Sequence, residues 1–252
     1  MGGRGRGHGA GDAGGGAAGP GRRPASGGGH WVSVAPERVE AWVAGFAARH
    51  GGHLVSVTGD ERMVVLRGAD GGRAEFLVPF PPMPPAAPDG LIAALAGHAR
   101  AERCVGVVLV RRGGHAAGVF HGAELLASKV GSRLVQGRSA AGGWSQQRFA
   151  RRREQQAGQA REAAAEVAAR VLAPYQDRLE AVVFGGDRRA VDALRADRRL
   201  APAFAIEAGP FLAVPDPRLA VLRDTPRSFR AVRVRVVEAG EAVGGEDAAH
   251  QL

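Results

Sequence analysis

The sequence predicts an α/β protein in which a small α+β domain precedes a larger domain built on a mixed β-sheet flanked by helices. Three observations carry this prediction. Helical and strand-like apolar patterns alternate along the chain, a proline-rich stretch at 79–85 interrupts them, and one long helical stripe runs from about 148 to 173. We therefore expect a disordered tail at 1–29, a small domain at 30–98, a larger domain at 99–240 and an acidic disordered tail at 241–252.

The predicted helices and strands of the small domain follow the tail at 1–29, which we expect to be disordered. Residues 1–29 are rich in glycine and arginine, and they hold too few hydrophobic side chains to offset the entropy of ordering. Residues 36–49 predict a helix, because apolar residues recur there at helical spacing, namely Val39, Trp42, Val43 and Phe46. Glycine-containing turns then separate three predicted strands, at 53–58, 62–67 and 73–79. The proline-rich connector ends this sheet, and a short helix is predicted at 90–101.

The larger domain opens with a predicted meander of three strands at 105–110, 116–121 and 124–133. The long helix predicted at 148–173 has an apolar stripe made of Phe149, Ala160, Ala164, Val167 and Val171. A buried strand at 181–184, a glycine turn and a helix at 189–196 follow. A last strand is predicted at 229–237, where alternate valines face one way.

The charge of the chain favours a polyanionic partner. Arginine and lysine number 34 against 25 acidic residues, which gives a formal net charge of +9. Lys129 is the single lysine, so the excess is arginine, whose planar guanidinium suits phosphates and stacking on bases. Codon bias in a GC-rich genome is the alternative explanation, since 39 glycines and 15 prolines accompany the arginines. The position of the arginines along the chain therefore matters more than their number.

Common catalytic and cofactor motifs are missing. Cys104 is the single cysteine, so an intramolecular disulfide and a cysteine-based zinc site are excluded. No H-E-x-x-H or G-x-S-x-G motif occurs, and no His, Asp and Glu residues have the spacing of a metal site. No apolar run is long enough to cross a bilayer. We expect a soluble cytoplasmic protein without metal or cofactor.

One stretch combines features that packing alone does not require. Residues 137–147 form a long glycine-containing segment that holds Trp144 and ends in two glutamines. The helix behind it begins with four arginines, Arg148, Arg151, Arg152 and Arg153. Positive charge near a helix N-terminus opposes the helix dipole, so a nearby anion is the natural compensation. A solvated basic face is the alternative interpretation.

A glycine-rich loop with a glutamine suits one class of chemistry. Glycine lets such a loop enter a narrow site, and a glutamine amide can orient a water molecule although it is no general base. Positioning of this kind can lower a reaction barrier by about 7 to 11 kcal/mol. The residues therefore favour hydrolysis of an activated ester that a larger particle already holds.

The order of these features resembles a known family. The loop Gly142-Gly143-Trp144-Ser145-Gln146-Gln147, followed by a helix that opens with Arg148-Phe149-Ala150-Arg151-Arg152-Arg153, resembles the catalytic domain of archaeal and eukaryotic class-I release factors. It is more similar still to the actinobacterial members of the Vms-like release factors. The resemblance covers about residues 100–240, with 31–98 as the small N-terminal domain of that branch. It implies a release-factor-type, RNase H-like catalytic domain and a peptidyl-tRNA hydrolase that rescues stalled large ribosomal subunits.

The resemblance also implies roles for individual residues. Gln146 matches the catalytic glutamine of the family, and the loop around it comprises Gly142, Gly143, Trp144, Ser145 and Gln147. Trp144 and Ser145 interrupt a literal Gly-Gly-Gln, which leaves Gln147 as the competing candidate for the catalytic residue. The basic residues expected to contact rRNA and tRNA phosphates are Arg138, Arg148, Arg151, Arg152 and Arg153. Trp144 stacks on an unpaired base or holds the free loop against the domain; both interpretations stay open.

The expected partners are the large ribosomal subunit, its rRNA and peptidyl-tRNA, without a membrane and with the protein as a monomer. Two other functions remain possible on the sequence. One is an endonuclease that cuts the acceptor end of tRNA, and the other is a ribosome- or RNA-binding factor without catalysis. A glutamine retained within a glycine-rich segment favours the hydrolase.

Overall fold

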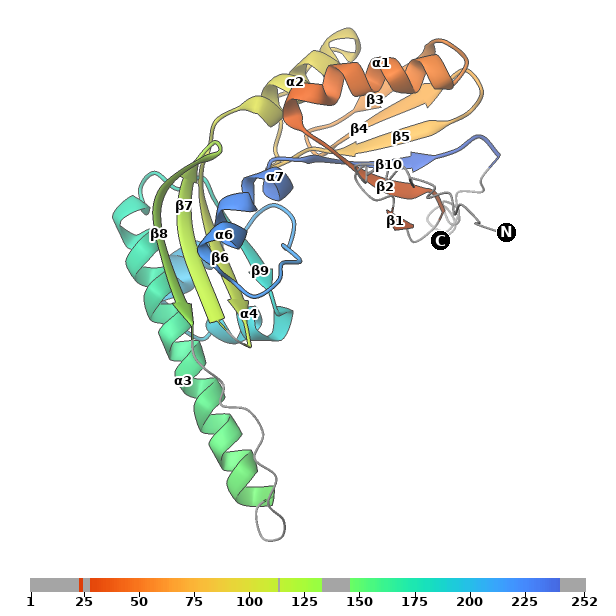
Figure 1. Ribbon diagram of the computed structural model, residues 1–252. Helices are drawn as coiled ribbons and strands as arrows, with labels where there is room; N and C mark the ends of the chain where they lie inside the picture. Colours follow the sequence, from red (N-terminus) through yellow and green to blue (C-terminus); the bar gives the residue numbers. More distant parts are fainter. Residues whose placement is uncertain (1–22, 25–27, 113, 133–145, 241–252) are drawn as a thin grey trace, which may run out of the picture.

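The computed structural model describes residues 23–24, 28–112, 114–132 and 146–240, with the backbone alone at 23–24, 132 and 146–153. Two units are visible, each with helices packed on its own β-sheet, as predicted (Figure 1). The tail predicted at 241–252 lies outside the described residues, as does most of the one predicted at 1–29. Within that first tail the prediction was wrong for Arg23–Pro24, which forms the short strand β1 beside β2.

The first unit is built on a six-stranded sheet in which all neighbouring strands are antiparallel. The strand order is β1-β2-β10-β5-β4-β3. The strands are β1 (Arg23–Pro24), β2 (His30–Val34), β3 (Leu54–Gly59), β4 (Met63–Gly68), β5 (Arg73–Leu77) and β10 (Val232–Val237). The three strands predicted within 53–79 are therefore present as β3, β4 and β5.

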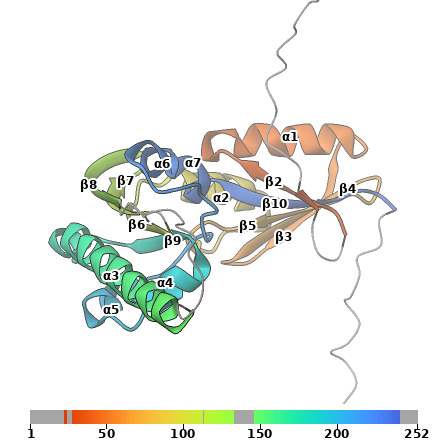
Figure 2. The ribbon, with the colours of Figure 1, turned by 60° about the horizontal axis from the view of Figure 1, so that its bottom comes forward.

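Two helices cover one face of this sheet. They are α1 (Val39–Arg49), which follows the 3₁₀ turn η1 (Pro36–Arg38), and α2 (Leu91–Arg100), which follows η2 (Pro88–Gly90). Figure 2 shows α1 above the sheet, and the core between helices and sheet includes Phe46, Leu66, Phe76 and Leu95, all fully buried. Each such side chain contributes about 1.5 to 3 kcal/mol when it leaves water. Both predicted helices are thus present.

The last strand corrects the predicted domain boundary. The sequence assigned residues up to 240 to the larger domain, but β10 lies in the middle of the first sheet, between β2 and β5. Its buried valines, Val232, Val234 and Val236, face α1 and α2. The alternating pattern correctly predicted a half-buried strand. It carries no information on which sheet that strand joins, because strand pairing is set by the complete fold.

The second unit contains the predicted meander and one parallel strand. The strand order is β8-β7-β6-β9, with β6 antiparallel to β7 and parallel to β9. The strands are β6 (Cys104–Arg111), β7 (Gly114–His121), β8 (Glu124–Ser132) and β9 (Ala181–Gly186). The mixed sheet that the sequence predicted is therefore confirmed.

Helices lie on both faces of this sheet (Figure 2). Along the central strand β6, Val108 and Val110 belong to the core on one side, and Val107 and Leu109 to the core on the other. The first side is covered by α3 (Gln146–Leu172), α4 (Arg188–Leu194) and α5 (Ala201–Ala205), with η3 (Ala173–Tyr175) and η4 (Arg198–Leu200) between them. The second side is covered by α6 (Leu219–Asp224) and α7 (Pro226–Phe229). Within the described residues, no helix combines the length and the apolar character needed to span a bilayer.

The turn after β9 needs glycine for a steric reason. Gly186 has a φ of 102°, and a Cβ there would lie 2.1 Å from the carbonyl oxygen of Val110. Asp187 then caps α4, because its side chain accepts a hydrogen bond from the backbone N–H of Ala190. The sequence predicts an ordinary packing turn at this strand-to-helix junction. The close approach of Gly186 to Val110 and the cap by Asp187 are typical of such a turn.

The connector between the units is packed and not a free spacer. The ring of Phe80 packs against that of Phe229 of α7, at 6.2 Å between ring centroids, and the guanidinium carbon of Arg103 lies over the Phe80 ring, 5.6 Å from its centroid. The φ of Phe80 is 49°, a left-handed conformation that a bulky residue adopts only where packing enforces it. The chain crosses between the units again just after Phe229, before β10 begins. Two adjacent crossings and a shared aromatic contact thus join the units.

A histidine fixes the same junction from the side of α2. The Nε2–H of His98 donates to the carbonyl oxygen of Pro79 at 2.9 Å, while the guanidinium of Arg103 donates to the carbonyl oxygen of His98 at 2.8 Å. Burial, and then the charge of Arg103, lowers the pKa of His98. His98 is therefore neutral in the folded chain near neutral pH.

Removal of residues 232–252 is expected to unfold the first unit, because β2 and β5 lose their shared neighbour and the core loses three buried valines. Hydrogen exchange should show loss of protection for the amides of β2 and β5 while β6 and β7 stay protected. A chain ending at residue 240 is the control and should keep full protection. Retained protection of β5 in the shorter chain would contradict this role of β10.

Acidification is expected to weaken the fold through His98. Folding lowers the pKa of His98, so the unfolded chain binds a proton at a higher pH than the folded chain does. The free energy of unfolding therefore decreases as the pH falls below about 6.5, the pKa of histidine in the unfolded chain. Burial lowers the pKa of His115 as well, which adds to the same trend. His98→Gln keeps a donor for Pro79 and should flatten the pH dependence seen in urea melts between about pH 6.5 and 5. The exposed His121→Gln serves as control, and an unaltered slope in His98→Gln would refute the assignment.

Candidate functional site

The predicted site lies at the start of α3, the longest helix of the described chain. With 27 residues, α3 is about 40 Å long. It begins at Gln146, two residues before the predicted start, so Gln146 and Gln147 occupy its first turn and not the loop before it. Glutamine has good helix propensity, which accounts for this earlier start.

The second half of α3 is packed closely on the sheet. The residues that it buries are mostly alanines, namely Ala164, Ala165, Ala168, Val171 and Leu172. Small side chains let the helix approach strands β7 and β8. Gly106 of β6 also allows this close packing of α3, because a Cβ there would lie 2.8 Å from a methyl group of Leu172.

The first half of α3 leaves the domain. Residues 154–157 are all exposed, and Figure 1 shows the helix extending well past the edge of the four-stranded sheet. Of the predicted stripe, Ala164 and Val171 are buried and Ala160 and Val167 are half-buried, while the side chain of Phe149 lies outside the described part of the structure. Gln146 thus stands at the far end of a helix whose base is fixed and whose tip lies away from both cores.

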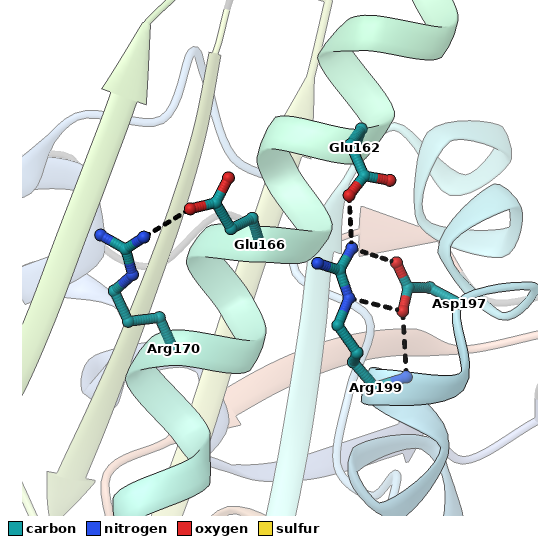
Figure 3. Close-up of polar contacts among 5 residues, drawn as sticks. All are labelled: Glu162, Glu166, Arg170, Asp197 and Arg199. Carbon is teal, nitrogen blue, oxygen red and sulfur yellow. Dashed lines mark hydrogen bonds and ion pairs between the residues drawn. The ribbon is translucent and has the colours of Figure 1, made fainter.

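An arginine from η4 fixes the point where α3 leaves the sheet (Figure 3). The guanidinium of Arg199 donates to Glu162 of α3 at 2.7 Å and to Asp197 at 2.6 Å. Asp197 also caps η4, because its Oδ1 accepts from the backbone N–H of Arg199 at 3.0 Å. One turn further along α3, Glu166 and Arg170 form an ion pair within the helix.

The contacts of Arg199 shift the pKa values of Arg199 and Asp197. The hydrogen bond from the guanidinium of Arg199 is the main cause of the lowered pKa of Asp197. Asp197 and Glu162 together raise the pKa of Arg199 above its ordinary value. Asp197 therefore stays ionised at neutral pH. The contact of Arg199 with Glu162 ties α3 to η4 across 37 residues of chain.

The structure leaves part of the predicted site outside the described residues. These are Arg138 and the loop residues Gly142, Gly143, Trp144 and Ser145. The remaining predicted residues, Gln146, Gln147, Arg148, Arg151, Arg152 and Arg153, are placed by their backbone in the first two turns of α3. The structure thus brings the two glutamines and four arginines to one helix end.

The charge of that helix end is one-sided. No acidic residue lies in the first turn of α3, and Glu154 is the first to follow the arginines. Arg148 lies in the first turn, where it meets the positive end of the helix dipole at a cost of some tenths of a kcal/mol at low salt, and three more arginines follow in the next turn. An anion bound at the tip removes that cost, and a phosphate backbone offers several.

Other reactive groups of the second unit are placed for packing. Cys104 is buried at the start of β6, and burial raises the pKa of its thiol, so it is not a thiolate nucleophile. Its backbone N–H is held by the carboxylate of Glu180 at 3.0 Å. Within the described residues, no three His, Cys, Asp or Glu side chains gather as a metal-binding group would.

Sequence reasoning missed the anchor of α3. Asp197 followed by a short helical segment is a recognisable N-cap signal, so the cap could have been found. The contact from Arg199 to Glu162 carries no local signal, because it joins residues 37 positions apart on two separate elements.

Comparison with known proteins identifies the second unit. The family model of the Actinobacteria/chloroflexi VLRF1 release factor matches residues 103–235, more than half of the 252-residue chain. This range contains α3 with the predicted glutamine, and the strands and helices that form the cores on both faces of the four-stranded sheet. No curated protein matches the chain.

Solved structures give distant likenesses. An archaeal protein is 15% identical, with 66% of this chain and 52% of that chain covered and a TM-score of 0.35. The archaeal translation termination factor aRF1 is 16% identical, with 76% and 61% covered and a TM-score of 0.38. The Vms1 mitochondrial localization core is 8% identical, with 78% and 80% covered and a TM-score of 0.39. The chain thus spans less than two thirds of the length of the first two, and its family assignment rests on the match over 103–235.

Replacing Arg199 by alanine is expected to loosen α3 where it leaves the sheet, because Glu162 loses its contact with η4. Exposed ion pairs are weak, so amide exchange around Glu162 should rise by about two- to fivefold with little change in the melting temperature. Arg170→Ala is the matched control, since its partner Glu166 lies on the same helix. Equal exchange in both variants would show that Arg199 does not anchor the helix.

Proposed function

This chain belongs to the family of Actinobacteria/chloroflexi VLRF1 release factors, and from that membership we propose that it is a peptidyl-tRNA hydrolase. It frees nascent chains from peptidyl-tRNA on stalled large ribosomal subunits, in the cytoplasm and as a monomer, without a cofactor. The observation that supports this most is the position of Gln146. It opens a helix that is anchored at its base and extends away from the protein, directly behind the glycine-containing segment 137–145.

The reach of α3 suits a substrate that lies deep in another particle. The ester of peptidyl-tRNA is held inside the large subunit, so the catalytic group must be presented well beyond the folded domain. The half of α3 in front of Ala160, 14 residues, supplies about 21 Å of such reach. The contact of Glu162 with Arg199 ties the helix to η4 at the base of this segment.

Gln146 acts by placing water and not by taking a proton. Its carboxamide is both donor and acceptor, so it orients one water molecule toward the ester carbonyl carbon. The water oxygen forms the new C–O bond, the bond to the ribose oxygen breaks, and the proton passes to that oxygen as it leaves as a hydroxyl group. Backbone N–H groups near the glutamine stabilise the developing oxyanion. The residues Gly142, Gly143, Trp144 and Ser145, together with Gln147 in the first turn of α3, shape this tip.

The arginines bind the nucleic acid that surrounds the ester. Arg138, Arg148, Arg151, Arg152 and Arg153 contact phosphates of rRNA and of the tRNA acceptor arm, which fixes position without reading sequence. Trp144 stacks on an unpaired base at the same end. The charge that is unfavourable for the isolated helix is thereby compensated in the complex.

Replacing Gln146 by alanine is expected to lower peptide release from isolated large subunits that carry peptidyl-tRNA by about 100-fold or more, because the water loses its orienting group. Single-turnover release measures this, and cosedimentation should show unchanged subunit binding. Gln156→Ala, an exposed glutamine further along the same helix, is the matched control and should release at the wild-type rate. Gln147→Ala should retain most of the activity.

Three outcomes would overturn the proposal. Wild-type release by Gln146→Ala with loss in Gln147→Ala would move the catalytic role to the second glutamine. A shortened CCA end on the released tRNA, seen by mass spectrometry, would identify an endonuclease. Binding to the subunit without any release by the unaltered chain would leave a non-catalytic ribosome-binding factor.

A further inference from the structure

The six-stranded sheet has a second face, opposite α1 and α2, that no helix of the described chain covers (Figures 1 and 2). Cross-strand register shows which side chains share this face. Arg235 lies between Trp31 and Glu75, Arg233 lies between Ser33 and Leu77, and Arg73 lies beside Arg67. The intervening residues, such as Val234 and Phe76, point into the core instead.

This face is strongly positive. The strands place Arg67, Arg73, Arg233 and Arg235 on it, and Glu75 is their one acidic residue there. Glu75 lies between two of the arginines, at 3.0 Å from Arg73 and 3.5 Å from Arg235. Arg67 and Arg233 are exposed, so their guanidinium groups meet solvent above that inner cluster.

An aromatic stack stands among these charges. The guanidinium of Arg233 lies over the ring of Trp31, 4.6 Å from the ring centroid. Trp31 is half-buried and Arg233 exposed, so the flat guanidinium is the outer layer of the stack. A planar group held in this way presents a surface on which a nucleobase can lie.

Two arginines of this face lie directly opposite each other on neighbouring strands. Arg67 and Arg73 are direct cross-strand partners of β4 and β5, and like charges directly opposite each other destabilise a sheet. Glu75 is shared by Arg73 and Arg235. A phosphate at the exposed Arg67 places a negative charge on the solvent side of this pair.

We propose that this sheet face binds single-stranded RNA, with bases stacked on the Trp31 and Arg233 pair and phosphates held by Arg67 and its arginine neighbours. Flat stacking groups beside positive charge are what single-stranded nucleic acid requires, because every base has a flat face and every linkage a negative charge. An acidic peptide satisfies the charge but gains nothing from the stack. The site lies on the other unit from Gln146 and is independent of the proposed hydrolysis.

Binding of a fluorescein-labelled oligouridine about 12 nucleotides long to the full chain, followed by anisotropy, tests this site. Trp31→Leu keeps the charge and should weaken binding by about fivefold or more, because one stacked base is lost. Arg67→Ala and Arg233→Ala should each weaken binding and lower the slope of log affinity against log salt by about 0.7. Arg49→Ala, an exposed arginine of α1 on the opposite side of the same unit, should leave the slope and affinity nearly unchanged.

Crosslinking separates this site from the arginines of α3. Oligouridine that contains 4-thiouridine should crosslink under ultraviolet light to peptides of β2, β4 or β10, and these crosslinks should persist in Gln146→Ala. Crosslinks confined to α3, together with unchanged affinity in Trp31→Leu and Arg67→Ala, would overturn the proposal. So would binding of polyglutamate with the same affinity and the same dependence on Trp31, because that result would identify an acidic-protein surface.

Discussion

The packing of α3 along only its second half is the constraint on which the rest of the molecule depends. Alanines between Ala164 and Ala168 bring the helix close to the sheet, and Gly106 leaves room for Leu172 beneath it. Residues 154–157 in front of these contacts are exposed, and the start of the helix extends past the edge of the sheet. A helix that is packed at its base and extends past the sheet can place a glutamine and four arginines far from the fold that holds them.

The two units are tied by the path of the chain as well as by contact. The connector enters the second unit through Phe80, which packs on Phe229, and the chain returns to supply β10 to the middle of the first sheet. The first unit therefore depends on residues that follow the second unit in sequence. The positive sheet face and the tip of α3 consequently belong to one framework, which suits a protein that contacts a large nucleic-acid particle at two places.

Elements defined by local pattern could be predicted from the sequence, and placements that depend on distant partners could not. The helix stripe of Val39 to Phe46, the meander from β6 to β8 and the long helix were all expected, because each has its own periodicity. The sequence did not predict which sheet Val232–Val237 joins, because the pattern of a strand does not identify its neighbouring strands. For the site, the arginines and Gln146 were found in the sequence as a cluster, whereas the Arg199 contact with Glu162 has no sequence signature. The catalytic role of Gln146 stays a prediction.

The central claim is that α3 delivers Gln146 to the ester of peptidyl-tRNA, and a structure of the chain on a stalled large subunit tests it most directly. The account predicts that a single water molecule lies between the carboxamide of Gln146 and the ester carbonyl carbon. It also predicts that Arg148 to Arg153 lie along phosphates of rRNA and of the tRNA acceptor arm. A bound complex in which the start of α3 points away from the CCA end, with another group of the chain nearer the ester, would contradict it.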